Sequence, residues 1–309
     1  MRAPIRTRRH DDPSQRGFSL VELMVALAIG IFLLAGALTV FQQTRTQYRA
    51  IEAVSRLQES ARYAMSVLEN DLRLAGYWAK HSQSGSVTGI PAVLALALCD
   101  PDFDPTPANL RTYVAGGGAM TLNCATNPRA GTDVLIIRRS SVDPVPPELA
   151  ADEDTVPDLV DGVLYAQNSY VGTLVFEGDA IPTPYFSDTS DTHLLITNAY
   201  YVSNGSESDP NLPSLHRVSL AAGLAGPVAQ DDEIIQGIEN LTVEFGLDTN
   251  GDTAVDTWSV NPAALAADPP LAARVTLVAR AEPRENTVTP AGFRRFSITK
   301  TVYLRNERR

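Results

Sequence analysis

The chain has 309 residues, of which 44% are hydrophobic and 20% are charged, and its formal net charge at pH 7 is −11. This length is sufficient for a membrane helix and one sizeable domain. The strongly negative charge argues against nucleic acid or an anionic membrane surface as a partner.

The chain begins with a short basic segment, residues 1–17, which is followed by an apolar one. The basic segment carries five arginines against two aspartates, so the rest of the chain has a net charge of about −14. Such a flank predicts a cytoplasmic N-terminus and an exported C-terminal part. From Phe18 to Phe41 the only ionisable residue is Glu22, and the run is long enough to cross a bilayer as a helix. A charge in that position costs at least about 2.5 kcal/mol, which indicates a functional role for Glu22.

The stretch from Arg16 to Leu23 reads RGFSLVEL and resembles the processing site of a type IV prepilin. Its small residue, Gly17, lies before the apolar core, whereas the small-residue cleavage site of a secretory signal follows the core. The resemblance implies that a prepilin peptidase cuts after Gly17 and that Phe18 becomes an N-methylated terminus. It also implies that Glu22 pairs with the terminal amine of a neighbouring subunit, which would offset the cost of both charges in the membrane. A plain uncleaved membrane anchor is the alternative.

The apolar segment is predicted to continue as one helix to about Ala75, because no proline interrupts it, with Gly76 as its C-cap. We therefore expect an assembly and transmembrane half over residues 18–41 and an amphipathic half over residues 42–76.

Apolar residues of the amphipathic half recur at spacings of three and four, which predicts a single stripe. We expect this stripe to be part of the domain core, in preference to a coiled-coil partner surface. Glu52 with Arg56 and Glu69 with Arg73 are expected as ion pairs on the solvated side. The stripe consists of Ile51, Val54, Leu57, Ala61, Met65, Leu68, Leu72 and Ala75.

Residues 77–309 differ from the helical segment in composition, because they contain many prolines and glycines and only short apolar runs. Turn signals separate these runs, which approximate the alternation of half-buried strands. The stretch from Val142 to Asp161 is predicted as a solvated loop. The fold class is therefore α+β, with a long N-terminal helix packed on a mostly antiparallel, β-rich head, and the resemblance to a type IV prepilin implies a pilin-like fold. The predicted strands are 133–138, 193–202, 215–220, 238–245, 273–280 and 293–304.

Cys99 and Cys124 are the only cysteines of the chain, and both lie in the part predicted to be exported. An even number of cysteines in an oxidising compartment favours a disulfide. Closing this loop would stabilise the fold by about 3–4 kcal/mol. Two unrelated buried thiols are the alternative.

An Asp-rich loop, residues 248–256, reads DTNGDTAVD. Its alternating oxygen side chains can converge on Ca²⁺, with Asp248, Asn250, Asp252 and Asp256 as ligands and the carbonyl of Ala254 as a further one. An EF-hand loop, however, has Gly at the position of Thr253. A hairpin turn of Asx-type hydrogen bonds is the alternative.

The head resembles that of PilW-type minor pilins in the stretches 131–139, 200–202, 237–246 and 296–306. The resemblance implies a low-abundance subunit that acts with other minor pilins, the major pilin and the inner-membrane assembly platform to prime a pilus. It implies no required cofactor, a single-pass inner-membrane location with a periplasmic head before assembly, and a role in twitching, adhesion or DNA uptake. A pilus-tip adhesin is a further implied partner.

Two other classes of protein are alternatives to a minor pilin. A minor pseudopilin of a type II secretion system would share the leader, the helix and the head, and stays open. An anchored periplasmic enzyme is disfavoured, because the chain has no nucleophile-elbow, HExxH or phosphate-loop motif. His193 and His216 are expected as ordinary strand or turn residues.

Overall fold

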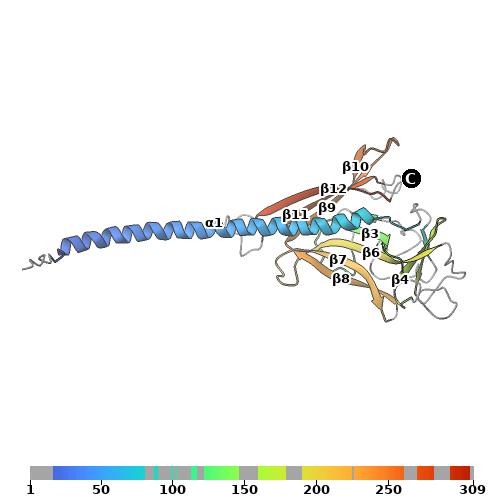
Figure 1. Cartoon of the computed structure of the whole chain (residues 1–309), viewed down its shortest axis with the longest axis horizontal. Coiled ribbons are helices and arrows are strands. Elements are labelled where there is room, and N and C mark those ends of the chain that lie inside the picture. The colour runs from blue at the N-terminus through green and yellow to red at the C-terminus, as the bar shows by residue number, and fades with distance from the viewer. Residues whose placement is uncertain are drawn as a thin grey trace, which may run out of the picture. The chain divides into compact units, whose positions relative to one another are not determined.

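The computed structural model describes residues 17–80, 87–89, 99, 103, 113–116, 122–145, 159–178, 190–224, 226–260, 270–281 and 293–306. It has two compact units, Met1–Ala50 and Ile51–Arg309. A single helix in the described residues, α1 (Leu20–Leu74), runs from the first unit into the second, and all strands belong to the second unit (Figure 1).

The C-terminus of α1 confirms the predicted glycine cap. The helix ends at Leu74, and Gly76 adopts a φ of 70°, a left-handed conformation that costs glycine little. The backbone N–H of Gly76 donates to the carbonyl of Arg138, at 3.2 Å. The turn after the helix is therefore attached directly to a strand of the head.

In the described residues, the strands of the head form two sheets. The first has eight strands in the order β1-β5-β4-β6-β3-β2, with β7 paired to β6 and β8 paired to β7, and the second has the order β10-β9-β11-β12. Every pair is antiparallel except β1 with β5, so the predicted α+β class is confirmed. The strands are β1 (Val87–Gly89), β2 (Tyr113–Gly116), β3 (Val134–Ser140), β4 (Leu164–Asn168), β5 (Thr173–Glu177), β6 (Asp191–Ser203), β7 (Ser214–Gly223), β8 (Gly226–Gln236), β9 (Ile238–Leu247), β10 (Thr257–Ser259), β11 (Ala272–Arg280) and β12 (Arg295–Tyr303).

All six predicted strands are present, as β3, β6, β7, β9, β11 and β12. The prediction missed the other six strands of the described residues, β1, β2, β4, β5, β8 and β10. The longest of these is β8, whose sequence GPVAQDDEIIQ has three consecutive acids and no regular alternation. Pairing with β7 supplies the strand conformation there, a tertiary effect that overrides weak local preference. Most of the predicted loop from Val142 to Asp161 lies outside the described residues.

The apolar face of α1 packs against β9, β11 and β12 of the four-stranded sheet (Figure 1). The core prediction is confirmed for the stripe from Leu57 to Ala75 but is wrong at its start. Ile51 is 67% exposed, Val54 is half-buried, and Ala53 is fully buried instead. At about 100° per residue Ile51 lies roughly 120° around the helix from Leu57, so it faces away from the sheet.

Candidate functional site

The first turn of α1 contains the residues predicted for processing and assembly. Ser19 precedes the helix, and its Oγ accepts a hydrogen bond from the backbone N–H of Glu22, at 3.2 Å. This contact is one half of a Ser-x-x-Glu capping box. It places Glu22 where the helix dipole favours an anion. The spacing of Ser19 and Glu22 is a sequence signal for this second role of Glu22, which the prepilin resemblance alone did not indicate.

The structure offers no local reason for a glycine at position 17. A Cβ added to Gly17 would meet no heavy atom within 4 Å, and Gly17 has no left-handed φ. A larger side chain is therefore compatible with the described fold. The cleavage role of Gly17 and the methylation of Phe18 stay predictions.

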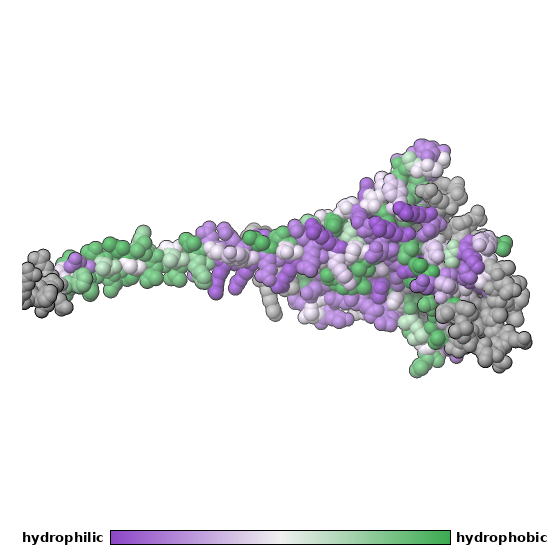
Figure 2. All heavy atoms as spheres, in the orientation of Figure 1, coloured by the Kyte–Doolittle hydropathy of each residue, from purple (hydrophilic) through white to green (hydrophobic). Residues whose placement is uncertain are grey.

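The apolar segment from Phe18 to Phe41 exposes its side chains along the whole of its length. Phe18 is 85% exposed and Phe32 is 81% exposed, and Figure 2 shows this part of the helix as an almost continuous apolar surface. By length and composition, α1 is able to cross a membrane. An apolar surface of this extent indicates contact with lipid or with other proteins.

A buried carboxylate attaches the last turns of α1 to the head. Asp71 is 5% exposed and accepts hydrogen bonds from Arg139 Nε at 2.8 Å, Asn198 Nδ2 at 2.7 Å and Tyr200 Oη at 3.0 Å. Burial and the adjacent Asp71 charge raise the pKa of the Tyr200 hydroxyl, so this hydroxyl stays a donor. The fully partnered group fixes the helix against β3 and β6.

A second acid of α1 contacts the C-terminal strand. Glu69 forms the predicted pair with Arg73, but the prediction of a solvated pair is wrong, because Glu69 is 8% exposed and also accepts from Lys300 of β12. The hydrogen bond from Lys300 is the main cause that lowers the pKa of Glu69, against a smaller rise from desolvation. The helix is therefore tied to both sheets.

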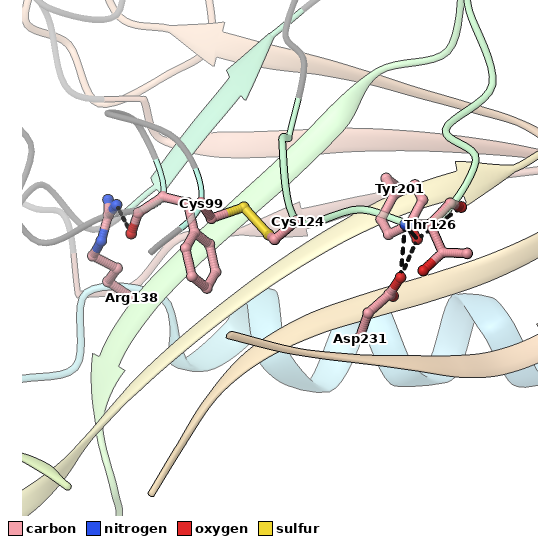
Figure 3. The surroundings of a disulfide bond; sticks show 7 residues. Cys99, Cys124, Thr126, Arg138, Tyr201 and Asp231 are labelled. Atoms are coloured by element: carbon pink, nitrogen blue, oxygen red, sulfur yellow. Dashed lines mark hydrogen bonds between the residues drawn. A yellow bond between two sulfur atoms is a disulfide. The ribbon is translucent and has the colours of Figure 1, made fainter. Parts of the chain in front are cut away.

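The predicted disulfide is present between Cys99 and Cys124, with their Cα atoms 4.9 Å apart (Figure 3). The two cysteines belong to an apolar cluster with Phe103 and Tyr201. The buried side chain of Arg138 donates to the carbonyl of Phe103, at 2.8 Å. The disulfide thus joins two residues on the face of β3 and β6 that is turned away from α1.

A polar network lies next to the disulfide (Figure 3). Asp231 accepts from Tyr201 Oη at 2.6 Å and from the backbone N–H of Thr126 at 2.8 Å, and it contacts His216 Nδ1 at 3.1 Å. Desolvation raises the pKa of Asp231, but the hydrogen bonds from His216, Tyr201 and Thr126 outweigh it and lower the pKa to about 2. The network joins β6, β7 and β8 through their side chains.

His216 contacts Asp231 through Nδ1 and Ser214 through Nε2. This order of contacts is that of the Asp-His-Ser triad of a hydrolase. His216 Nε2 lies 3.0 Å from Ser214 Oγ. Ser214 is fully buried, however, and its hydroxyl donates to the carbonyl of Gly205 at 2.9 Å. A buried hydroxyl that is already engaged in this way is a poor nucleophile for an external substrate, so we interpret the contacts as structural. His193 and His216 both lie in strands, as predicted.

The Asp-rich loop directs its carboxylates to its own backbone. Asp248 accepts from the amides of Gly251 at 2.6 Å and Thr253 at 2.8 Å, and Asp256 Oδ2 accepts from the amide of Thr249 at 2.9 Å. Desolvation raises the pKa of Asp248, but the amides, that of Thr253 foremost, outweigh it and lower the pKa. These are the Asx-type hydrogen bonds of a hairpin turn, which is the alternative to a calcium site. Within the residues that the structure describes, no group of three His, Cys, Asp or Glu could hold a metal, and calcium binding stays a prediction.

Two family models match the chain. Residues 199–306 match PilW, the Type IV Pilus-assembly protein W family, and residues 12–38 match the prokaryotic N-terminal methylation motif. The chain therefore carries an N-terminal methylation motif and, in its C-terminal part, a PilW-family match. It is similar to the pilin-like protein PilA3 of Thermus thermophilus, with 40% identity over 72 residues. That match spans 23% of this chain and 31% of the curated relative, and no solved structure matches.

The two matches fall on different parts of the molecule. The methylation motif covers Gly17, Phe18 and Glu22. The PilW match covers the end of β6 and the strands β7 to β12, and so contains the whole four-stranded sheet against which α1 packs. The strands β1 to β5 lie outside both matches.

Proposed function

We propose that this chain is a minor pilin that, after removal of residues 1–17, enters a type IV pilus and helps to prime its assembly. The observation that carries the proposal is the presence, on one chain, of the methylation motif and the PilW match. A membrane anchor in continuous helical connection with a folded head suits a subunit that waits in the membrane before assembly. Its partners would be the prepilin peptidase, other pilins, the assembly platform and a tip adhesin.

The assembly step would be an ion pair between subunits. Cleavage after Gly17 would create an ammonium group on Phe18, one residue before the Ser19 cap. In an apolar environment this cation and the Glu22 carboxylate each carry a large desolvation cost, which pairing with a neighbouring subunit would offset. The exposed apolar side chains of the same segment would then pack against the neighbouring helices.

The capping contact suggests a sharp test of this role. Both Gln and Ala at position 22 keep the backbone N–H that donates to Ser19 Oγ. Gln also keeps a side-chain acceptor for the backbone N–H of Ser19, the other half of a capping box, but removes the charge, whereas Ala removes both the acceptor and the charge. We therefore expect both Glu22→Gln and Glu22→Ala to be cleaved and methylated, and both to enter sheared pili at least about tenfold less than wild type, a difference of roughly 1.4 kcal/mol. Immunoblots of sheared pili from strains that carry a tagged chain would measure this incorporation.

The two variants separate charge pairing from helix capping. If Glu22→Gln enters pili normally and Glu22→Ala does not, the carboxylate acts as a cap and the ion pair is rejected. Mass spectrometry of the wild-type chain tests the processing itself. We expect a mature species that begins at Phe18 and carries one added methyl group, and a chain that keeps its leader would contradict the proposal.

An exported head is supported by the Cys99–Cys124 disulfide, because disulfides persist mainly in oxidising compartments. Protease added to spheroplasts should therefore degrade the head but leave the apolar segment. A deletion strain should lose surface pili and the twitching, adhesion or DNA uptake that depends on them. Normal pili together with lost protein secretion would assign the chain to a type II secretion system instead.

A further inference from the structure

Three arginines of the head meet at one buried carboxylate. Glu239 is 8% exposed, and Arg295 donates to it through Nε and Nη2. Arg129 and Arg280 each place a guanidinium nitrogen 3.7 Å from the same oxygen of Glu239, Oε1, which is beyond hydrogen-bond distance. We call these four residues the arginine cluster. It brings three positive charges to one negative charge, in a chain whose formal net charge is −11.

A β-bulge places Glu239 at this point. Its two neighbours in β9 pair with adjacent residues of β11, Val278 and Ala279, so Glu239 itself has no partner in this ladder. A bulge of this kind turns a side chain out of the regular alternation of its strand. The cluster lies where β9 and β12 begin and β11 ends, at one end of the four-stranded sheet.

Arg280 is a buried charge that other contacts hold in place. Its side chain is 10% exposed, its Nη2 donates to the carbonyl of Asn211, and its guanidinium carbon lies 4.3 Å from the centre of the Phe293 ring. Its Nε has no hydrogen-bond partner among the described residues. Desolvation is the main cause that lowers the pKa of Arg280, and the two other arginines lower it further, against the opposite effects of Glu239 and Asp209. Arg280 nevertheless stays protonated at neutral pH.

Arg129 has N–H donors that are available to a ligand. Its side chain is 31% exposed, and among the described residues the ion pair with Glu239 is the only polar contact of its guanidinium. Its backbone is fixed, because its N–H donates to the carbonyl of Val202 at 2.7 Å and its carbonyl accepts from Thr132 Oγ1 at 2.9 Å. A guanidinium presents its donors in a planar fork that matches a carboxylate. Arg129 can therefore bind a carboxylate without losing a hydrogen bond.

The exposed side of β12 extends this polar surface away from the cluster. Alternate residues of β12 pack into the core with α1, so the residues between them face the other way. A small anion at exposed arginines would gain only a screened interaction. An acidic polypeptide would in addition form hydrogen bonds with the hydroxyl groups of this side, so the surface favours a polypeptide. The exposed residues are Arg295, Ser297, Thr299, Thr301 and Tyr303.

We propose that the arginine cluster binds a carboxylate side chain in an acidic segment of a second protein. Arg129 would hold the carboxylate in a bidentate pair, Arg295 would contact it through Nη1, and the buried charge of Arg280 would add attraction. The rest of the segment would lie along the exposed side of β12. This docking site goes beyond the proposed function, since it requires a folded head and not a pilus.

The test uses the detergent-solubilised full chain and labelled peptides of about eight residues, a common strand length. One peptide alternates Glu with Ser, and its matched control alternates Gln with Ser. Because the chain and the Glu peptide are both negative overall, their net charges oppose binding. We expect saturable binding of the Glu peptide by fluorescence anisotropy at low salt, and at least about tenfold weaker binding of the Gln peptide. Inorganic phosphate in about tenfold molar excess over the peptide, at constant ionic strength, should displace little of it.

Variants locate the bound peptide. Arg129→Gln removes a charge that makes no hydrogen bond, so it should weaken binding at least about tenfold and change the unfolding temperature little. Arg129→Lys keeps the charge but loses the planar fork, so its affinity should be intermediate. Arg62→Gln removes an equal charge from an exposed arginine of α1 and should bind like wild type. Arg8→Gln gives the same comparison for the basic N-terminal segment.

Several results would overturn the proposal. No saturable binding of the Glu peptide would do so, as would equal binding of the Gln peptide or unchanged binding by Arg129→Gln. An equal loss for Arg62→Gln or Arg8→Gln would mean that the peptide senses only the net charge. Complete displacement by phosphate would assign the cluster to a small anion and not to a protein segment. Pilus incorporation is measured separately, so a failure here leaves the proposed function standing.

Discussion

The two halves of α1 use apolar side chains in opposite ways. In the first half Phe32 is 81% exposed, whereas in the second half Leu68 is fully buried against the sheet. The first half has no ionisable residue between Glu22 and Phe41, and the second alternates its apolar stripe with charged residues such as Arg56. A single helix therefore contains one segment that is stabilised by its own head and one that needs an external partner.

The comparison has an energetic consequence. Burying a large aliphatic side chain contributes about 1.5–3 kcal/mol. The head receives this contribution from residues such as Leu57 and Leu72, while the exposed half gains it only in lipid or among other helices. We therefore expect changes in the first half to affect processing and assembly, and changes in the second half to affect folding.

The largest expected effect is on processing. Gly17→Val should abolish leader removal and so keep the chain out of pili, because the substituted side chain would stand at the scissile bond. The structure predicts no folding defect, since a Cβ at Gly17 meets nothing within 4 Å. The mass of the purified chain measures the outcome.

Gly30→Val is the matched control for this change. A Cβ at Gly30 also meets nothing within 4 Å, and this position lies within the helix, away from the proposed cleavage site. We expect its leader to be removed as in wild type. A Gly17→Val chain of mature mass would show that the glycine is not a processing signal.

A leucine-to-alanine pair sharpens the comparison of the two halves directly. Leu68→Ala should lower the free energy of unfolding of the head by roughly 2–5 kcal/mol, because it leaves a cavity under the sheet. Leu33→Ala should leave that free energy unchanged, since Leu33 is 66% exposed. Both tryptophans, Trp78 and Trp258, lie in the head, so their fluorescence in a urea titration reports its unfolding alone. Equal losses for the two variants would refute the division of roles.

Much of the fold follows from local patterns in the sequence. The helix and its glycine cap, the six main strands and the cysteine pair each depend on residues a few positions apart or on a simple count. The helix face illustrates the limit. Spacing alone allowed Ile51 and Val54 to belong to the buried stripe, and only the position of the sheet shows that Ala53 takes that place.

The remaining features depend on contacts between residues that are distant in the chain. Asp71 and Asn198 are 127 positions apart, and Glu69 and Lys300 are 231 apart. The eight-stranded sheet branches at β6, because β4 and β7 pair with the two ends of this 13-residue strand. No periodicity in β6 records where each partner strand stops, so this branching of the sheet could not be predicted from the sequence.

A smaller effect is expected at the disulfide. Replacing both Cys99 and Cys124 by Ala should lower the free energy of unfolding by about 3 kcal/mol, because the unfolded chain loses a closed loop that spans 25 positions. Urea titrations with and without reductant provide the comparison. Reductant should destabilise the wild type toward the double variant and should leave the double variant unchanged. A reductant effect of equal size on both would mean that the bond does not contribute to stability.

The smallest expected effect is the pH dependence that Asp231 confers on the head. Its folded pKa of about 2 lies below the ordinary value of 3.8, so its stabilising contribution is present above that value and is lost as the pH falls from about 4 to 2. Because the group is partly screened by solvent, we expect less than about 2 kcal/mol. Asp231→Asn should therefore unfold more readily at neutral pH and show a shallower loss of stability in acid. Asp232→Asn removes a neighbouring carboxylate that contacts only the exposed side chain of Gln230 among the hydrogen bonds described for it, and should retain the wild-type slope. Identical acid profiles for Asp231→Asn and wild type would show that the contacts of Asp231 with Tyr201 and His216 do not stabilise the folded head.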